Sequence, residues 1–96
     1  MADLRTHADA DADYVEAYLW YFRQDRGVAN RFESEFEEAL EKIRSDPDWW
    51  AVYDEQHRFV RVKGFPYHVI FRCEDETIWV VAVAHDRRAP DYWRGR

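Results

Sequence analysis

The side chains that could do chemistry are concentrated in the segment 85–93, which has the sequence HDRRAPDYW. Its arginines can bind a phosphate through paired hydrogen bonds, and its tyrosine and tryptophan can stack on a base. It also contains a histidine, a residue type that can exchange protons in catalysis. The segment follows an apolar run, 77–84, with the composition of a buried strand. This combination suits a polyanionic ligand.

Two earlier stretches can add basic groups to the same surface. Arg58–Val62 is predicted to be a strand with Phe59 and Arg61 on one face and Arg58, Val60 and Val62 on the other, and alternate side chains of Tyr67–Cys73 likewise fall on opposite faces. Helices can cover only one face of such a sheet. The open face could then expose the following side chains: Arg61, His68, Arg72, His85, Arg87, Arg88 and Tyr92.

One reaction that these groups could support is cleavage of RNA by its own 2′-hydroxyl. It needs one group to remove the hydroxyl proton, one to protonate the leaving oxygen, and cations to stabilise the charged phosphorane. His68 or His85 could exchange the protons, and the arginines named above could supply the charge. The alternative is that those arginines form ordinary surface ion pairs with Asp86, Asp91 or the glutamates. The residues alone leave both interpretations open.

Metal and cofactor chemistry has little support in the sequence. The four histidines lack the spacing of a zinc site, and Cys73 is the only cysteine, which excludes an intrachain disulfide. Its place in an apolar run predicts a buried, inert thiol. The three glycines are isolated, so no glycine-rich phosphate loop is present. We expect no metal and no cofactor.

Length and composition indicate one domain, 1–96, with a single core. The 96 residues are 47% apolar and 18% aromatic, which favours a packed domain over disorder. The net charge is −6, but residues 1–50 hold 13 acidic and 6 basic side chains, whereas residues 51–96 hold 7 and 8. The chain as a whole therefore does not resemble a nucleic-acid-binding protein, although its second half could present a basic face. With no signal peptide and no run near the ~20 residues of a membrane span, we expect a cytoplasmic protein.

The elements that position these groups can be placed by hydrophobic periodicity. Val15, Leu19 and Phe22 recur at helical spacing after three aspartates, and Gly27 is expected to end this helix. A clearer helix covers Val28–Ser45, so the two should form an antiparallel hairpin. Three strands follow, with a further short strand possible at the start. The pattern predicts an α+β fold in which a helical hairpin packs on one side of an antiparallel meander.

Several of these segments resemble the RelE/ParE superfamily of bacterial toxins, and more narrowly its ParE-like plasmid stabilisation branch. The resemblance is carried by Pro47–Asp48–Trp49, by Arg58, by FPYHVIFR at 65–72 and by IWVVAVAHDRRAPDYWRGR at 78–96. The turn FPY combined with AVAHxRRxPxYW is its most specific part. It implies a β-α-α-β-β-β fold with an N-terminal strand around 2–7 and a sheet of three to four strands.

The resemblance also implies a partner and a target. The partner would be a cognate antitoxin whose disordered tail folds onto the toxin in a hetero-oligomer. RelE-like members cut messenger RNA on the ribosome, whereas ParE-like members poison DNA gyrase. Arg61 and Phe59 stand where RelE-like enzymes carry two lysines. His68 stands in the place of a strand arginine, Arg87 matches the arginine after the strand, and Tyr92, with Trp93 as the second choice, matches the C-terminal tyrosine.

The resemblance therefore leads to three hypotheses. The first is a ParE-like inhibitor of DNA gyrase, because Phe59 is apolar where a nuclease needs a cation. The second is an mRNA interferase with His68, Arg87 and Tyr92 as its catalytic residues. The third is an inactive toxin that only binds its antitoxin and helps to repress their promoter. The expected target contacts are Arg58, Arg61, Arg72, His85, Arg88 and Trp93, and the expected antitoxin contacts are Tyr14, Tyr18, Tyr21, Trp49 and Trp50.

Overall fold

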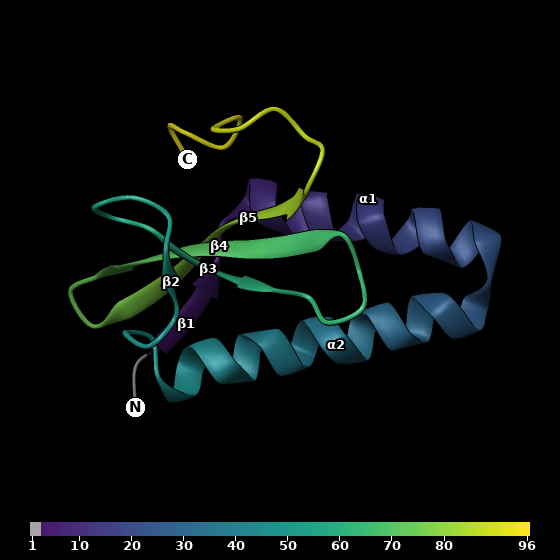
Figure 1. The fold of residues 1–96 in the computed structure, drawn as a ribbon, viewed down its shortest axis with the longest axis horizontal. Helices are drawn as coiled ribbons and strands as arrows, with labels where there is room; N and C mark the ends of the chain where they lie inside the picture. Colours follow the sequence, from purple (N-terminus) through teal and green to yellow (C-terminus); the bar gives the residue numbers. More distant parts are fainter. Residues whose placement is uncertain (1–2) are drawn as a thin grey trace.

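The computed structural model describes residues 3–96 as two helices and a sheet. The C-terminal segment passes over the sheet on the side away from α2 (Figure 1). The expected α+β fold with β-α-α-β-β-β order is confirmed, with one additional short strand. The elements are β1 (Asp3–Thr6), α1 (Ala8–Gln24), α2 (Arg26–Ser45), β2 (Ala51–Val52), β3 (Arg58–Arg61), β4 (Tyr67–Glu74) and β5 (Thr77–His85).

The sheet contains five strands in the order β1-β5-β4-β3-β2. β3, β4 and β5 form the expected antiparallel meander, and β1 pairs with β5 in parallel. β5 is therefore a central strand, as its near-continuous apolar sequence predicted. The strand expected around 2–7 is found at Asp3–Thr6, while Ala2 lies outside the described residues. β2 was not predicted, because two residues carry no periodic signal.

A single residue, Asp25, joins the two helices. Its backbone N–H donates to the Tyr21 carbonyl at 2.8 Å and so closes α1, and its carboxylate accepts from the Gly27 N–H at 2.7 Å and caps α2. The prediction that Gly27 ends the first helix is therefore wrong, since it lies in the first turn of α2. A Cβ at Gly27 would sit 3.1 Å from the capping Oδ1, so a larger residue there would require the Asp25 side chain to shift by a few tenths of an ångström.

α1 faces the core with a different set of residues from the one expected. Its buried positions are Ala10, Asp13 and Ala17, with Tyr14, Tyr18 and Tyr21 packed partly buried beside them. The small alanines bring the helix close to β5, and the tyrosine rings fill the space toward α2 and the β3–β4 turn. The expected apolar stripe lies on the outer face and is exposed, together with a neighbouring tryptophan: Val15, Leu19, Trp20 and Phe22.

The main core lies between the helical hairpin and one face of the sheet. The apolar stripe expected on α2 is confirmed, with Phe32, Phe36 and Ile43 buried against Val69 and Val80 of the sheet. This packing determines which side chains of each strand point toward the helices. We call this side of the sheet the helix face.

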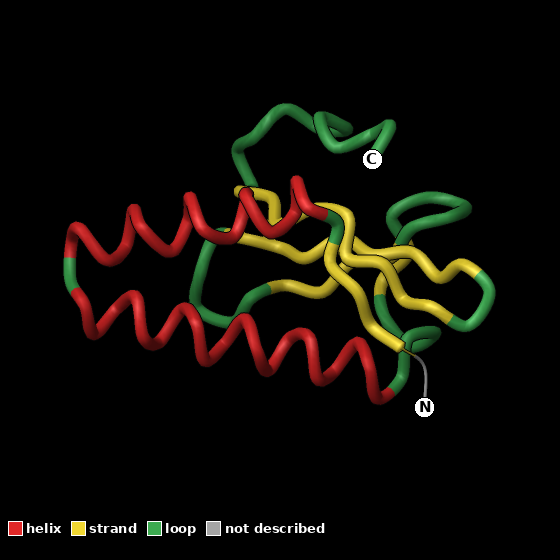
Figure 2. The backbone as a smooth tube through the Cα atoms, turned by 180° about the vertical axis from the view of Figure 1, so that it is seen from behind, coloured by secondary structure: helices red, strands yellow, loops and turns green. Residues whose placement is uncertain are grey.

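The other side of the sheet is covered by the C-terminal segment, residues 86–96, which we call the tail. Trp93 is 2% exposed and clusters with Ile70, Val81, Ala82 and Ala84. A β-bulge places Val81 and Ala82 together on this side, because the register changes from Ile70↔Ala82 to Phe71↔Val80. Figure 2 shows the tail crossing above the strands, on the side away from α2. The expectation of an open basic face is therefore wrong over much of this surface.

No helix of residues 3–96 is long and apolar enough to span a membrane.

Candidate functional site

The tail is held at the edge of β5 by a buried aspartate. β1 pairs with β5 only as far as Val80, which leaves the backbone of Val81 and Val83 without strand partners on that edge. Asp13 of α1 accepts from the Val83 N–H at 3.2 Å and from the Tyr92 hydroxyl at 2.9 Å. Arg96 donates to Asp13 at 2.8 Å and to the Val81 carbonyl at 3.0 Å. Side chains thus replace the missing strand and fasten the tail at the same time.

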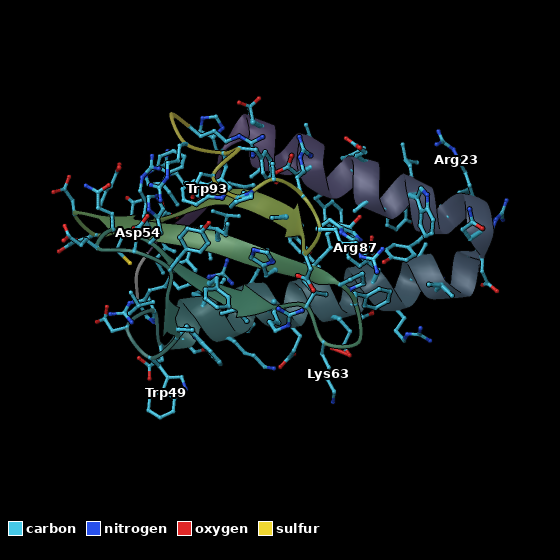
Figure 3. The ribbon with its side chains drawn as sticks, turned by 45° about the horizontal axis from the view of Figure 1, so that its top comes forward. Arg23, Trp49, Asp54, Lys63, Arg87 and Trp93 are labelled. Carbon is cyan, nitrogen blue, oxygen red and sulfur yellow. The ribbon has the colours of Figure 1, made fainter. Side chains whose placement is uncertain are left out.

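A second aspartate holds the other side of the tail. Asp54, in the loop between β2 and β3, accepts from the His57 ring at 2.9 Å and from Arg94 at 2.8 Å. The buried His57 ring packs 4.6 Å from the Trp93 ring, and the Arg94 guanidinium lies over the same indole. The Trp93 side chain is therefore enclosed between loop, sheet and tail. Figure 3 shows Asp54 and Trp93 at the same end of the sheet.

The environment of these groups shifts their ionisation. Burial and the adjacent Asp13 carboxylate raise the pKa of the Tyr92 hydroxyl far above its ordinary range. Burial opposes the ionisation of Asp54, but its hydrogen bonds from Gln56, His57 and Arg94 outweigh this and lower its pKa. Tyr92 is therefore a hydrogen-bond donor at neutral pH, and Asp54 is a carboxylate.

Beside the tail, a third aspartate bridges two strands. Arg61 of β3 and His68 of β4 are cross-strand partners. Asp86 accepts a hydrogen bond from Arg61, and its other oxygen lies 3.0 Å from the His68 Nδ1. Burial opposes ionisation of Asp86, but these two hydrogen bonds lower its pKa. Together with Tyr53 and Phe59, the three residues line a hollow of about 330 Å³.

An adjoining hollow of about 320 Å³ runs under the tail and shares His68, Asp86 and Tyr53 with the first. Arg88 and Tyr92 also line it, and the Arg88 guanidinium lies 3.9 Å from the centre of the Tyr92 ring. These two hollows form the candidate site, because they bring together most of the groups that the sequence suggested for a polyanion. Arg87 lies outside both linings, beyond the end of β5 (Figure 3).

The structure separates two of the other expected target contacts from this site. Arg58 points to the helix face and donates to the Trp50 carbonyl at 2.8 Å. Arg72 pairs with Glu74 at 2.7 Å and lines other pockets, toward the opposite end of the sheet. His85 belongs to the lining of the second hollow, but its ring packs 5.0 Å from the Tyr67 ring on the helix face.

Trp93 is the clearest correction to the expected target contacts. It was expected at an exposed surface, but it is enclosed by the sheet and the Asp54 contacts. A long apolar side chain on the tail gains more from covering the apolar sheet than from solvent exposure.

The arrangement is poorly suited to RNA cleavage. The Tyr92 hydroxyl donates to Asp13, and its raised pKa keeps it protonated at neutral pH, so the tyrosinate form that could accept a proton is scarcely populated. The charge of Arg61 is paired with Asp86, and that of Arg72 with Glu74, as in the alternative interpretation of surface ion pairs. No group of three or more possible metal-binding side chains occurs within residues 3–96.

The residues expected to bind an antitoxin are only partly available. The three tyrosines of α1 pack against the core, and burial raises the pKa of Tyr14 to about 12. Trp50 is anchored by its indole N–H, which donates to the Lys42 carbonyl at 3.1 Å. Trp49 is 74% exposed and projects away from the fold (Figure 3).

Sequence reasoning missed the residues that build the site. Asp13 carries a signal only for the helix dipole, and Asp54 and Asp86 look like ordinary surface acids. Asp13 contacts residues 70 to 83 positions away along the chain, a pairing that no local pattern encodes.

The prediction that Cys73 is buried is wrong, because its side chain is exposed at the end of β4. Partial burial and the Asp48 carboxylate nevertheless raise the pKa of its thiol.

Comparison with known proteins finds similarity to ParE toxins in sequence and to a ParDE system in fold. The sequence model described as "ParE toxin of type II toxin-antitoxin system, parDE" matches residues 4–90. Toxin ParE2 of Mycobacterium tuberculosis, in strains CDC 1551 and H37Rv, is 29% identical over 89 residues, covering 92% of this chain and 85% of the relative. A solved structure described as "Chromosomal ParDE TA system from P. aeruginosa" superposes with a TM-score of 0.77 over 88% of this chain and 96% of that chain. Its sequence is 17% identical, so it shows the fold alone.

Proposed function

Because this chain belongs to the ParE family of toxins of type II toxin–antitoxin systems, we propose that it inhibits DNA gyrase and is neutralised by a cognate antitoxin. The observation that favours this choice over RNA cleavage is that the expected catalytic groups are engaged within the chain: the Tyr92 hydroxyl donates to Asp13 and stays protonated, so it is not available as a base, and Arg61 is paired with Asp86. A toxin that binds its target without hydrolysis needs no such base. It needs an exposed surface of suitable charge.

The exposed arginines at the start of the tail are the proposed target contacts. Within residues 3–96, neither Arg87 nor Arg88 forms an ion pair with a carboxylate. The Arg88 guanidinium is oriented by the Tyr92 ring below it. Both side chains are therefore free to bind the carboxylates of a protein or the phosphates of the DNA that gyrase holds.

A gyrase supercoiling assay with purified proteins tests this proposal. The wild-type toxin should inhibit supercoiling at micromolar concentration, and the double variant Arg87→Ala/Arg88→Ala should need about tenfold more protein, as expected for the loss of charged contacts worth ~1.4 kcal/mol. Arg23→Ala is the matched control, because Arg23 is an exposed arginine on α1, distant from Arg87 in Figure 3. Absence of inhibition by the wild type, or equal loss in the control, would reject the proposal. Messenger RNA cleavage on ribosomes would establish the interferase alternative instead.

We also propose that the antitoxin covers the outer face of α1. This face carries Val15, Leu19, Trp20 and Phe22, and Trp20 alone is 56% exposed. The expected contacts on this helix therefore move from the tyrosines to their exposed neighbours. The hairpin beneath is acidic, since residues 8–45 hold 10 acidic and 5 basic side chains. The complementary partner is an antitoxin helix with an apolar stripe and basic flanks.

Co-expression of the toxin with the adjacently encoded antitoxin tests this surface. Leu19→Asp places a charge in the centre of the apolar face and should reduce co-purification at least about tenfold. Val52→Asp is the matched control, because Val52 is an exposed apolar residue on β2, outside the proposed surface. Both variants should stay folded, since neither position is buried. Retention of the antitoxin by Leu19→Asp at the wild-type level would place the contact elsewhere.

A further inference from the structure

Asp86 occupies a position that an external anion would otherwise fill. It follows β5 directly, and its backbone N–H donates to the Pro66 carbonyl at 2.9 Å, which fixes it beside the β3–β4 turn. From there its two oxygens bind separate donors, the Arg61 guanidinium and the His68 ring. Arg61 is largely exposed, so the pair is reachable from solvent. One carboxylate held between an arginine and a histidine is the geometry of a bound oxyanion.

The wall of the same hollow is aromatic. The Phe59 ring packs edge-on against His68, with ring centres 5.8 Å apart, and Tyr53 lies 6.4 Å from Phe59. All three rings line the hollow that contains Arg61 and Asp86. Two nitrogen donors, one of them an arginine, beside aromatic rings fit a ligand that carries an anion next to a flat ring. A phosphate joined to a nucleoside has both features, whereas an acidic side chain has only the anion.

We infer that Arg61 and His68, with Tyr53 and Phe59, form a binding site for the phosphate of a nucleotide, and that Asp86 closes this site from within the chain. The ligand phosphate and the Asp86 carboxylate compete for the same two donors. Asp86 therefore lowers the affinity of the site, as a competing ligand would. Turning Asp86 away exposes both donors without any change in the strands, because their cross-strand register is independent of the side-chain contact.

This inference is independent of gyrase inhibition. The proposed ligand contacts lie on β3, β4 and the β2–β3 loop, and Asp86 of the tail blocks them, whereas the proposed gyrase contacts are the neighbouring Arg87 and Arg88. Each can fail alone, since nucleotide binding is measured on the isolated toxin without gyrase.

Titration of the purified toxin with adenosine 5′-monophosphate, followed by NMR chemical shifts, tests the site. Asp86→Asn keeps the shape of the side chain, removes its charge and should bind the nucleotide about fivefold more tightly than the wild type, the factor expected when a partly exposed ion pair no longer competes. Glu74→Gln is the matched control, because it makes the same change of charge at the Arg72 pair, outside the site. It should leave the affinity unchanged.

Two further measurements separate the parts of the inference. Adding Arg61→Gln to Asp86→Asn should return the affinity to the wild-type level or below, since it removes the main donor. Ribose 5-phosphate should bind the Asp86→Asn variant at least about fivefold more weakly than the nucleotide, because it lacks the stacking ring.

Several results would overturn the inference. An equal gain in Glu74→Gln would mean that only the overall charge matters. A terminally blocked Glu–Glu dipeptide that binds Asp86→Asn as tightly as the nucleotide would show a site for acidic peptides instead. If Asp86→Asn fails to fold, Asp86→Ser serves in its place, and no gain in affinity there would reject the competition.

Discussion

Replacing Asp13 by asparagine should release the tail from the edge of β5. Asp13 is 8% exposed and accepts hydrogen bonds from Val83, Tyr92 and Arg96. Asparagine preserves the volume of the side chain but carries one amide oxygen in place of two charged ones. Val83, Tyr92 and Arg96 all donate to the same oxygen, Oδ2, which the amide oxygen can replace only without its charge. Arg96, which is itself mostly buried, then loses its nearest counter-ion, and the amide nitrogen faces its guanidinium in place of Oδ1.

The size of the effect follows from these contacts. Removing one partner of a buried ion pair costs about 3–5 kcal/mol, because the remaining charge stays buried and uncompensated. Arg96 retains its hydrogen bond to the Val81 carbonyl, a longer contact of 3.8 Å with the Asp9 carboxylate and some solvent contact, so the lower end of the range applies. We expect a loss of about 3 kcal/mol, which is a large part of the roughly 5–15 kcal/mol that stabilises a small domain.

Urea denaturation measures this loss. With a slope of about 1–2 kcal/mol per molar urea for a domain of this size, the midpoint should fall by roughly 1.5–3 M. Trypsin should also cut the variant sooner after Arg87, Arg88 or Arg94, because the released tail becomes accessible. Asp11→Asn is the matched control: Asp11 lies in the same helix but is exposed, and its midpoint should barely move.

Either of two results would refute this account of the tail. A loss below about 1 kcal/mol in Asp13→Asn would mean that the hydrogen bonds to Asp13 are not what holds the tail. A loss in Asp11→Asn as large as in Asp13→Asn would mean that the helix dipole, not the buried contacts, is responsible.

Two further predictions concern the enclosure of Trp93. Trp93→Ala should lower the free energy of unfolding by about 3–5 kcal/mol in urea denaturation, because a buried indole is lost from the sheet surface. Trp49→Ala, at an exposed position, should change the free energy of unfolding by less than about 0.5 kcal/mol. Equal losses in the two variants would contradict the burial of Trp93. Asp54 has a lowered pKa in the folded state, so its contribution to stability is present above the unfolded pKa near ~3.9 and is lost as pH falls through the folded value. Thermal unfolding followed between pH 7 and pH 2 should therefore show a shallower acid decline for Asp54→Asn than for the wild type, and parallel curves would contradict the role of Asp54.

Much of the scaffold was predictable because its causes are local. The apolar stripe of α2 and the run of β5 bury themselves by hydrophobic periodicity alone, and both were placed correctly. The core-facing side of α1 was predicted wrongly, since alanines and tyrosines contact the core, whereas Val15, Leu19 and Phe22 are exposed. Its sequence has apolar residues around most of its circumference, so periodicity does not select one face, and close packing against β5 decides.

The sequence by itself determined the fold class, the family and the groups available for binding, because these depend on composition, spacing and motifs. Only the tertiary structure decided how those groups are used. It buried Trp93, turned His85 to the helix face, and placed Asp13 and Asp86 against partners far away in the chain. The physical reason is that an aspartate looks the same in a sequence whether it meets water or a buried arginine. Its role follows from the distance to its partner, which folding alone sets.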